Sequence, residues 1–185
     1  MTTALDLSTL TGDYTLDAAH TRIGFVARHA MVTKVRGAFN DFEGTIRVDG
    51  AVPAQSSAKV VIKAASIDTR NAQRDEHIRS ADFLALETYP EITFVSTGVR
   101  QTGDTTFEVT GDLTVKDVTK PVAVEFEFEG TATDPFGNVR IGFEGSVTVS
   151  RKDFGITWNA ALETGGVLVS DKIVLEFEVS AIKAA

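Results

Sequence analysis

The chain contains no cysteine, which excludes disulfide bonds, thiolate nucleophiles and thiolate metal sites together. It also lacks any uncharged stretch approaching the roughly 18 apolar residues that a membrane-spanning helix needs. Its first residues have neither the basic segment nor the apolar segment of a secretory signal peptide. We therefore expect a soluble, cytoplasmic protein.

Basic residues are in the minority, with 18 Lys and Arg against 26 Asp and Glu and a formal net charge of −8. This distributed acidity repels phosphate backbones at long range, so nucleic acid is not an expected partner. Polar aromatics are scarce as well, since 12 Phe stand beside two Tyr and one Trp. Phe has no polar atom to satisfy, so it suits the lining of a cavity and an ordinary core equally well.

Apolar and charged residues alternate along most of the chain. In residues 122–129, Val and Phe occupy the even positions and Glu fills 125, 127 and 129. Alternation of this kind is typical of a strand with one buried and one wet face. The same reasoning predicts further strands at 12–17, 22–29, 34–39, 42–49, 58–64, 91–99, 106–115, 139–149, 154–158 and 173–179.

Short turn sequences separate these predicted strands, among them Gly103-Asp104, Lys120-Pro121 and residues 134–138. Gly, Asp and Pro are favoured where a chain reverses, and short connections make neighbouring strands antiparallel. Strands with one apolar face must stack or close to hide that face, and closure also removes exposed edges. We predict an all-β fold: one domain over residues 1–185, an extended antiparallel β-barrel with an apolar interior.

One segment breaks the alternation. Residues 71–79 are rich in helix formers, with Asn71 placed to cap the helix and Asp75 four residues before Arg79 as a favourable ion pair. A second brief turn is expected over 81–87, capped by Ser80 and with Phe83 on its apolar side. We interpret residues 71–89 as a helical lid against one opening of the barrel.

The three histidines have no spacing that would bring ring nitrogens together, so no metal site is predicted. His29 is in phase with Phe25 and Ala27 and should point into the barrel. It is either a hydrogen-bonded core residue or a polar contact for an oxygen of a ligand. Because no nucleophile motif with a base and an oxyanion stabiliser occurs, neither catalytic residues nor cofactors are predicted.

Three arginines, Arg70, Arg74 and Arg79, surround the predicted lid. A guanidinium matches the oxygens of an anionic head group in a two-point fork. Alternatively, the four carboxylates between positions 68 and 82 neutralise these arginines on a solvated face. The residues alone leave both interpretations open.

Seven segments, in order along nearly the whole chain, resemble the YceI-like family of polyisoprenoid-binding, lipocalin-like barrel proteins. They are Leu16-Asp17-Ala18-Ala19-His20-Thr21 with Ile23-Gly24-Phe25 and Arg28-His29; Gly37-Ala38-Phe39 with Phe42-Glu43-Gly44; Ile67-Asp68-Thr69; Arg74-Asp75 through Arg79-Ser80-Ala81-Asp82-Phe83; Tyr89-Pro90-Glu91-Ile92-Thr93-Phe94; Gly111-Asp112-Leu113-Thr114; and Arg151-Lys152-Asp153-Phe154-Gly155-Ile156. The resemblance implies an extended barrel around a long apolar tunnel for an isoprenoid chain, with a helical segment near one mouth. Many family members carry a secretory signal, which this sequence does not show.

The resemblance implies non-catalytic binding, storage or transport of a long-chain isoprenoid lipid, of the polyprenyl phosphate or isoprenoid quinone type. Strand phase then assigns the tunnel lining to Phe25, Ala27, His29, Phe39, Ile46, Phe94, Leu113, Val124, Phe126, Ile141 and Phe143. The head-group or lid residues are Arg74, Arg79 and Phe83. Besides the lipid, a transient membrane contact and a second copy of the chain are candidate partners.

Two alternative functions stay open at this point. The first is an enzyme that acts on an isoprenoid or quinone inside the same cavity, for which His29 and His20 are the inward titratable candidates. The second is an interaction barrel, related to stress, whose centre is packed solid. An open bore along the barrel axis separates the lipid carrier from the packed barrel.

Overall fold

The structure, a computed structural model, describes residues 6–163 and 166–184 and consists mainly of strands. Its strands are β1 Gly12–Leu16, β2 Arg22–His29, β3 Thr33–Phe39, β4 Phe42–Val48, β5 Ser57–Lys63, β6 Ile67–Asp68, β7 Glu91–Gln101, β8 Thr106–Val115, β9 Val118–Thr133, β10 Val139–Ser150 and β11 Lys172–Lys183. The α-helix is α1 Ala72–Arg79, and the short 3-10 helices are η1 Leu7–Leu10, η2 Pro53–Gln55, η3 Ala64–Ser66 and η4 Arg151–Phe154.

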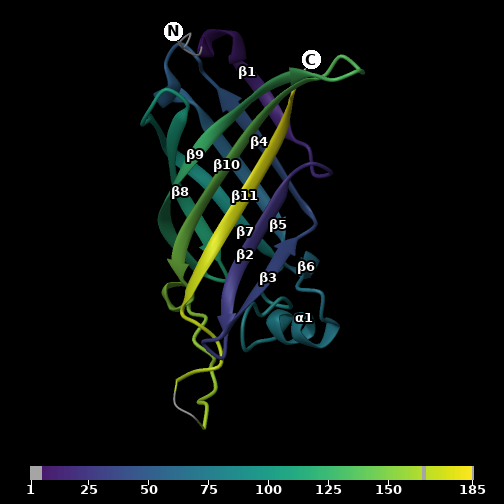
Figure 1. The fold of residues 1–185 in the computed structure, drawn as a ribbon, viewed down its shortest axis with the longest axis vertical. Helices are drawn as coiled ribbons and strands as arrows, with labels where there is room; N and C mark the ends of the chain where they lie inside the picture. Colours follow the sequence, from purple (N-terminus) through teal and green to yellow (C-terminus); the bar gives the residue numbers. More distant parts are fainter. Residues whose placement is uncertain (1–5, 164–165, 185) are drawn as a thin grey trace.

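An antiparallel barrel is formed by the ring β1, β4, β5, β7, β8, β9, β10 and β11, which closes where β11 pairs with β1. Further along β11, β2 takes the place of β1 as the neighbour, and β3 and β6 extend the wall from there. Figure 1 shows the strands inclined across an elongated barrel, with both termini at one end and α1 at the other. These are called the η1 end and the α1 end below.

The bend between β1 and β2 has a local cause in the side chain of Asp17. Its carboxylate accepts hydrogen bonds from the Ala19 N–H at 3.1 Å and from Arg140 Nη1 at 2.5 Å, and it lies 2.7 Å from His20 Nδ1. Aspartate favours such turns because its oxygens reach backbone groups two residues further on. The chain therefore leaves the line of β1 and re-enters the wall as β2.

The predicted alternation is confirmed in β9. Val124 and Phe128 are buried, whereas Glu125, Glu127 and Glu129 are exposed. Most other predicted strands agree with the structure within two residues at each end. The all-β antiparallel barrel with one short helix is thus confirmed.

Two predictions along the strands were wrong. Residues 154–158 do not form a strand, because Phe154 ends η4 and Gly155 follows it in the left-handed conformation with φ 74°. Lys120-Pro121 is not a turn but lies within β9, where Pro121 is opposite Asp112. The chain reverses earlier, at Lys116, whose φ is 59°.

The helix begins where predicted, with the Asn71 side chain accepting a hydrogen bond from the Arg74 N–H at 2.9 Å. The expected ion pair between Asp75 and Arg79 was wrong. Asp75 is buried and accepts hydrogen bonds from the Thr69 N–H at 2.9 Å and the Thr69 hydroxyl at 2.6 Å. The predicted brief turn over 81–87 is confirmed: this stretch forms turns that fold back onto α1, and the Ser80 hydroxyl accepts a hydrogen bond from the Asp82 N–H at 3.3 Å.

The η1 end of the barrel is packed. Tyr14 is almost fully buried there among Leu10, Phe128, Ile141 and Ala181, and its hydroxyl donates a hydrogen bond to the Leu10 carbonyl at 2.8 Å. A second packed cluster lies beside α1 and includes Ile67, Leu84 and Ile92. Several residues of both clusters also line the cavity described next.

Candidate functional site

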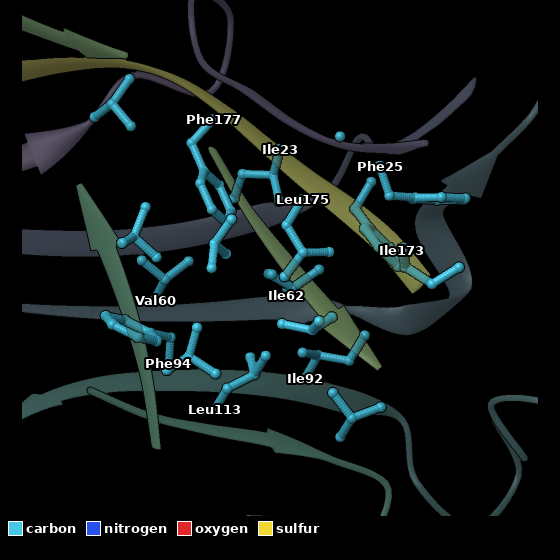
Figure 2. Close-up of a pocket in the computed structure, with 18 of the residues that line it drawn as sticks. Ile23, Phe25, Val60, Ile62, Ile92, Phe94, Leu113, Ile173, Leu175 and Phe177 are labelled. Atoms are coloured by element: carbon cyan, nitrogen blue, oxygen red, sulfur yellow. The ribbon is translucent and has the colours of Figure 1, made fainter. Parts of the chain in front are cut away.

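A single cavity of about 980 Å³ extends inside the barrel from the η1 end to the α1 end. This volume is at the upper end of the range typical of small-molecule sites. Figure 2 shows side chains from β2, β5, β7, β8 and β11 pointing into it. They are Ile23, Phe25, Val60, Ile62, Ile92, Phe94, Leu113, Ile173, Leu175 and Phe177.

All eleven residues that strand phase assigned to the tunnel lining border this cavity. They are Phe25, Ala27, His29, Phe39, Ile46, Phe94, Leu113, Val124, Phe126, Ile141 and Phe143. The strand register therefore has the predicted faces inward. Their contact with a ligand stays a prediction.

Three inward phenylalanine rings each lie over a glycine of a neighbouring strand. A Cβ added to the glycine would stand 2.4 to 2.7 Å from a ring atom, closer than real side chains approach. The pairs are Phe25 over Gly37, Phe94 over Gly111 and Phe126 over Gly145. A missing Cβ lets a ring from a paired strand settle on the wall, so the glycines keep these rings away from the axis.

The bore is consequently open. Phe94 and Phe126 are only partly buried although they point inward, because the space beside their rings is empty. Phe126 and Phe177 are 6.0 Å apart between ring centroids, and this contact runs along the wall, because both residues pair with Gly145 of β10. The alternative of a barrel packed solid along its axis was therefore wrong.

Three rings gather where the cavity reaches the α1 end. His77 of α1 is edge-on to Trp158, with ring centroids 4.6 Å apart, and to Phe83, at 5.0 Å. Phe83 and Trp158 are 5.3 Å apart, and all three line the cavity. His77 Nε2 is in turn 2.9 Å from Asp82 Oδ2. We call these three residues the aromatic gate.

His29 lies at the rim of the same opening, in the predicted phase but exposed. It is therefore not a hydrogen-bonded core residue. Asn71 and Gln73 are also exposed and line the cavity, so the cavity reaches the surface here. The segment predicted as a lid does lie against an opening of the barrel.

The lid arginines differ in position. Arg74 lines the cavity, and its Nε and Nη2 donate hydrogen bonds to the hydroxyl and the carbonyl of Thr69, at 2.7 and 2.6 Å. Arg79 does not line the cavity; it donates to the carbonyls of Ala65 and Ile67 and so fastens α1 to the wall. Arg79 belongs to the lid segment, Arg74 and Phe83 border the cavity, and contact of any of the three with a head group stays a prediction.

A residue that the sequence reasoning missed, Arg151, is buried at the same end. Its side chain lines the cavity with only 5% of the residue exposed. It donates hydrogen bonds to the carbonyls of Ile156 at 2.8 Å, Trp158 at 2.9 Å, Ser170 at 2.9 Å and Val169 at 3.3 Å. Arg151 thereby holds the segment after η4 against the barrel.

The structure does not bring together His20 and His29, the two inward candidates of the enzymatic alternative. His20, one of the two inward candidates, is outside the cavity and exposed, where it pairs with Asp17. Within residues 6–163 and 166–184, no group of three His, Asp or Glu side chains is arranged to hold a metal ion. No helix of this described part is long and apolar enough to cross a bilayer.

The glycine pairs, the gate and Arg151 had no clear signal in the sequence. Gly37 and Gly145 are inside predicted strands, where glycine hints at a close approach but not at the partner ring. Trp158 is the last residue of the segment wrongly predicted to form a strand, and Arg151 lies between that segment and the strand predicted over 139–149. Their roles depend on how residues 151–163 and 166–171 fold back across the opening.

A closed antiparallel barrel with a long apolar bore, open at one end beneath a helix, is a lipocalin-like binding barrel. The chain belongs to the YceI-like domain family, whose model matches residues 14–181. It is 44% identical over 149 residues to a UPF0312 protein of Azotobacter vinelandii, covering 80% of this chain and 78% of the relative.

Two solved structures have the same fold. BcnA of Burkholderia cenocepacia is 26% identical, with a TM-score of 0.79 over 89% of this chain and 98% of its own. A polyisoprenoid binding domain from Saccharophagus degradans is 16% identical, with a TM-score of 0.71 over 92% and 98% of the two chains. The second likeness is one of fold.

Proposed function

We propose that this protein binds a long-chain isoprenoid lipid in its bore and acts as a reversible, non-catalytic carrier or storage site. The observation that supports this most directly is the open apolar cavity of about 980 Å³ along the barrel. Family membership points the same way, since a neighbour of the same fold is a polyisoprenoid binding domain. The ligand enters tail first and leaves its head group at the α1 end.

The energetics favour exchange over permanent capture. Burying one five-carbon isoprene unit is worth about 3 to 4 kcal/mol relative to water, at roughly 0.8 kcal/mol per methylene-sized group. A bilayer rewards the same carbons almost equally, so transfer from membrane to bore is nearly neutral in its apolar contribution. Head-group contacts and the fit of the bore then decide the direction of transfer.

A carrier of this kind needs a surface on which to meet the bilayer, and the α1 end offers one. Met31, Val32 and Val167 are 58%, 74% and 38% exposed. The β2–β3 turn joins the segment that contains Val167, because the Ala30 N–H donates a hydrogen bond to the Leu168 carbonyl at 2.7 Å. Figure 1 shows this turn at the end opposite the termini. Met31, Val32 and Val167 are called the apolar tip.

Charge around the apolar tip suits an anionic bilayer. Residues 28–34, 116–120 and 151–172 together contain seven Lys and Arg against four Asp and Glu, although the whole chain has 18 against 26. Residues 68–87, on the α1 side, contain three basic and five acidic residues. The side of the opening that carries the apolar tip therefore faces the membrane, and the side that carries α1 faces away from it.

An enzymatic function has less support. The deep part of the bore is lined by aliphatic and phenylalanine side chains, and the titratable lining residues are at its two ends. Catalysis on an isoprenoid would need an acid, a base or a nucleophile beside the reacting carbon. The geometry supports binding of an isoprenoid chain in the bore, not a chemical reaction of that isoprenoid.

Mass spectrometry of an organic extract tests the proposal. The full chain is purified without detergent and extracted, with a Phe126→Trp, Val124→Phe variant that fills the bore as the comparison. We expect a polyprenyl species from the natural sequence and a strong depletion of that species in the filled variant. An extract without isoprenoid, combined with no uptake of an added prenyl lipid, would overturn the proposal.

Cytoplasmic localisation and a homodimer stay predictions. Cell fractionation tests the first and light scattering of the purified chain tests the second. Neither is required for the bore to hold a lipid.

A further inference from the structure

The charged residues that line the cavity are distributed unevenly. Arg28, Arg74 and Arg151 border it at the α1 end, together with His29 and His77, whereas Asp49 borders it at the η1 end. Among the residues the structure describes, no carboxylate lines the α1 end. The opening of the bore therefore has a cationic lining in a chain that is acidic as a whole.

Arg151 contributes a charge that no contact neutralises. Its four hydrogen bonds go to backbone carbonyls, which satisfy its N–H groups but carry no formal charge. In the described part of the chain, no carboxylate oxygen is within 4.0 Å of its guanidinium. The Asp171 carboxylate is occupied by the Ser150 hydroxyl at 2.7 Å and acts on Arg151 only from a distance.

Burial makes this unpaired charge costly. It lowers the pKa of the Arg151 guanidinium, and Asp171 offsets only part of that effect. A buried charge is tolerated when hydrogen bonds and a counter-charge compensate for the lost water. Here the hydrogen bonds are present and the contacting counter-charge is not.

Arg74 is held in position by its neighbours. The Thr69 hydroxyl accepts from Arg74 Nε at 2.7 Å and donates to Asp75 at 2.6 Å, so the buried carboxylate orients the guanidinium through Thr69. Nε and Nη2 are used in these contacts, and within residues 6–163 and 166–184 Nη1 makes no hydrogen bond. Arg74 therefore presents a donor and a charge at the cavity opening.

We propose that the α1 end of the cavity binds an anionic head group, so that the ligand is a prenyl phosphate and not a neutral prenol or quinone. The lipid lies with its phosphate among Arg74, Arg151 and the rim histidines, and its tail extends toward the η1 end. This inference rests on the proposed function and specifies its ligand class. It explains why a cation is buried beside an apolar bore.

The test compares two ligands with the same tail and different heads, geranylgeranyl phosphate and geranylgeraniol. Trp158 is the one tryptophan of the chain and lines the opening, so its fluorescence reports binding of either ligand. We expect the phosphate to bind the natural sequence at least tenfold more tightly than the alcohol. This ratio should fall as salt is raised.

Variants identify the source of the preference. Arg74→Gln should weaken binding of geranylgeranyl phosphate severalfold more than binding of geranylgeraniol, and Arg74→Lys should retain part of the phosphate-to-alcohol ratio. Arg36→Gln is the matched control, because Arg36 is on the outer face of the barrel near Glu176 and does not line the cavity. It should leave the ratio unchanged.

The outcomes separate the inference from the proposed function. Equal affinity for both ligands in the natural sequence would overturn the anionic head group and leave the isoprenoid carrier standing. Equal losses for both ligands in Arg74→Gln would show that Arg74 only shapes the opening, which also contradicts the inference. Binding of neither ligand would overturn the proposed function itself.

Discussion

His77 and Trp158 meet edge to face, with ring centroids 4.6 Å apart and ring planes at 85°. The two residues come from α1 and from the segment after η4, which approach each other across the opening of the cavity. Phe83 completes the aromatic gate. We expect a lipid that enters from the α1 end to separate these side chains, so that the gate controls how fast the bore exchanges its ligand.

Trp158→Ala should accelerate ligand exchange. The substitution removes the contacts of Trp158 with His77 and Phe83, each worth about 0.5 to 1.5 kcal/mol. We expect release to become about tenfold faster, since 1.4 kcal/mol corresponds to a factor of ten. Stopped-flow displacement of a fluorescent prenyl analogue measures the rate.

The control is Phe136→Ala, which removes an aromatic side chain that is 89% exposed at the η1 end. Unchanged release in Trp158→Ala would show that the gate does not limit exchange.

Gly37→Ala should narrow the bore. The added Cβ would be 2.4 Å from the ring of Phe25 and 2.9 Å from the Thr69 side chain, so the ring has to leave the wall. We expect weaker binding of a prenyl ligand and a loss of stability of about 1 to 3 kcal/mol. Titration with geranylgeraniol and chemical denaturation measure the two effects.

A double variant tests whether the displaced ring of Phe25 is what weakens ligand binding. Phe25→Leu combined with Gly37→Ala should recover part of the lost affinity, because the smaller side chain clears the added methyl group. Gly98→Ala is the matched control, since nothing lies within 4 Å of the Cβ it would add. If Gly37→Ala bound the ligand as well as the natural sequence does, the ring would not need its place on the glycine.

The sequence was sufficient to predict which strand faces point inward. Phe25 and Ala27 of β2, and Val124 and Phe126 of β9, follow from period two alone, because successive side chains point to opposite faces. It was not sufficient to predict an open bore. That depends on Phe25 lying opposite Gly37 across two strands, and register between strands is not contained in the alternation of either one.

The polar end of the site was harder to predict for a different reason. Asp75 reads as an exposed partner of Arg79, yet it turns inward because Thr69 offers it two hydrogen-bond donors. Arg151 reads as a surface residue of a basic pair, yet four carbonyls of a folded-back loop surround it. Both depend on tertiary contacts with no local periodicity to report them.

Polar substitutions in the apolar tip should weaken contact with membranes. Met31→Ser combined with Val32→Ser removes two exposed apolar side chains beside the opening. Because burying one such side chain fully is worth about 1.5 to 3 kcal/mol, we expect at least tenfold weaker binding to vesicles of phosphatidylglycerol and phosphatidylcholine. Co-sedimentation measures the bound fraction. Phe136→Ser, at the other end, should bind as the natural sequence does. Equal binding of the double variant would remove the apolar tip from the exchange mechanism.

Acid should destabilise the barrel by protonating two aspartates, Asp17 and Asp134, that bind Arg140 at the η1 end. Arg140 Nε is 2.9 Å from Asp134 Oδ2, and its Nη1 reaches Asp17. Burial opposes ionisation of Asp134, but hydrogen bonds from Asn138, Phe136 and Arg140 prevail and lower its pKa to about 2. The hydrogen bond from Arg140, together with His20, also lowers the pKa of Asp17.

The sign follows from linkage between protonation and folding. An Asp in the unfolded chain has a pKa of about 3.9, so the folded state holds the ionised form of Asp134 more strongly than the unfolded state does. Its stabilisation is complete above that value and is lost as the pH falls toward about 2. Denaturation at a series of pH values between those limits should show the decline. Arg140→Gln should lower stability at neutral pH and make the decline shallower, because Asp17 loses the donor that lowers its pKa most, while Asp134 loses one donor and keeps those of Asn138 and Phe136. Arg47→Gln is the control, since its exposed partner Asp13 is bound at 3.0 Å on the outer wall. An equally steep decline in Arg140→Gln would assign the acid sensitivity to other carboxylates.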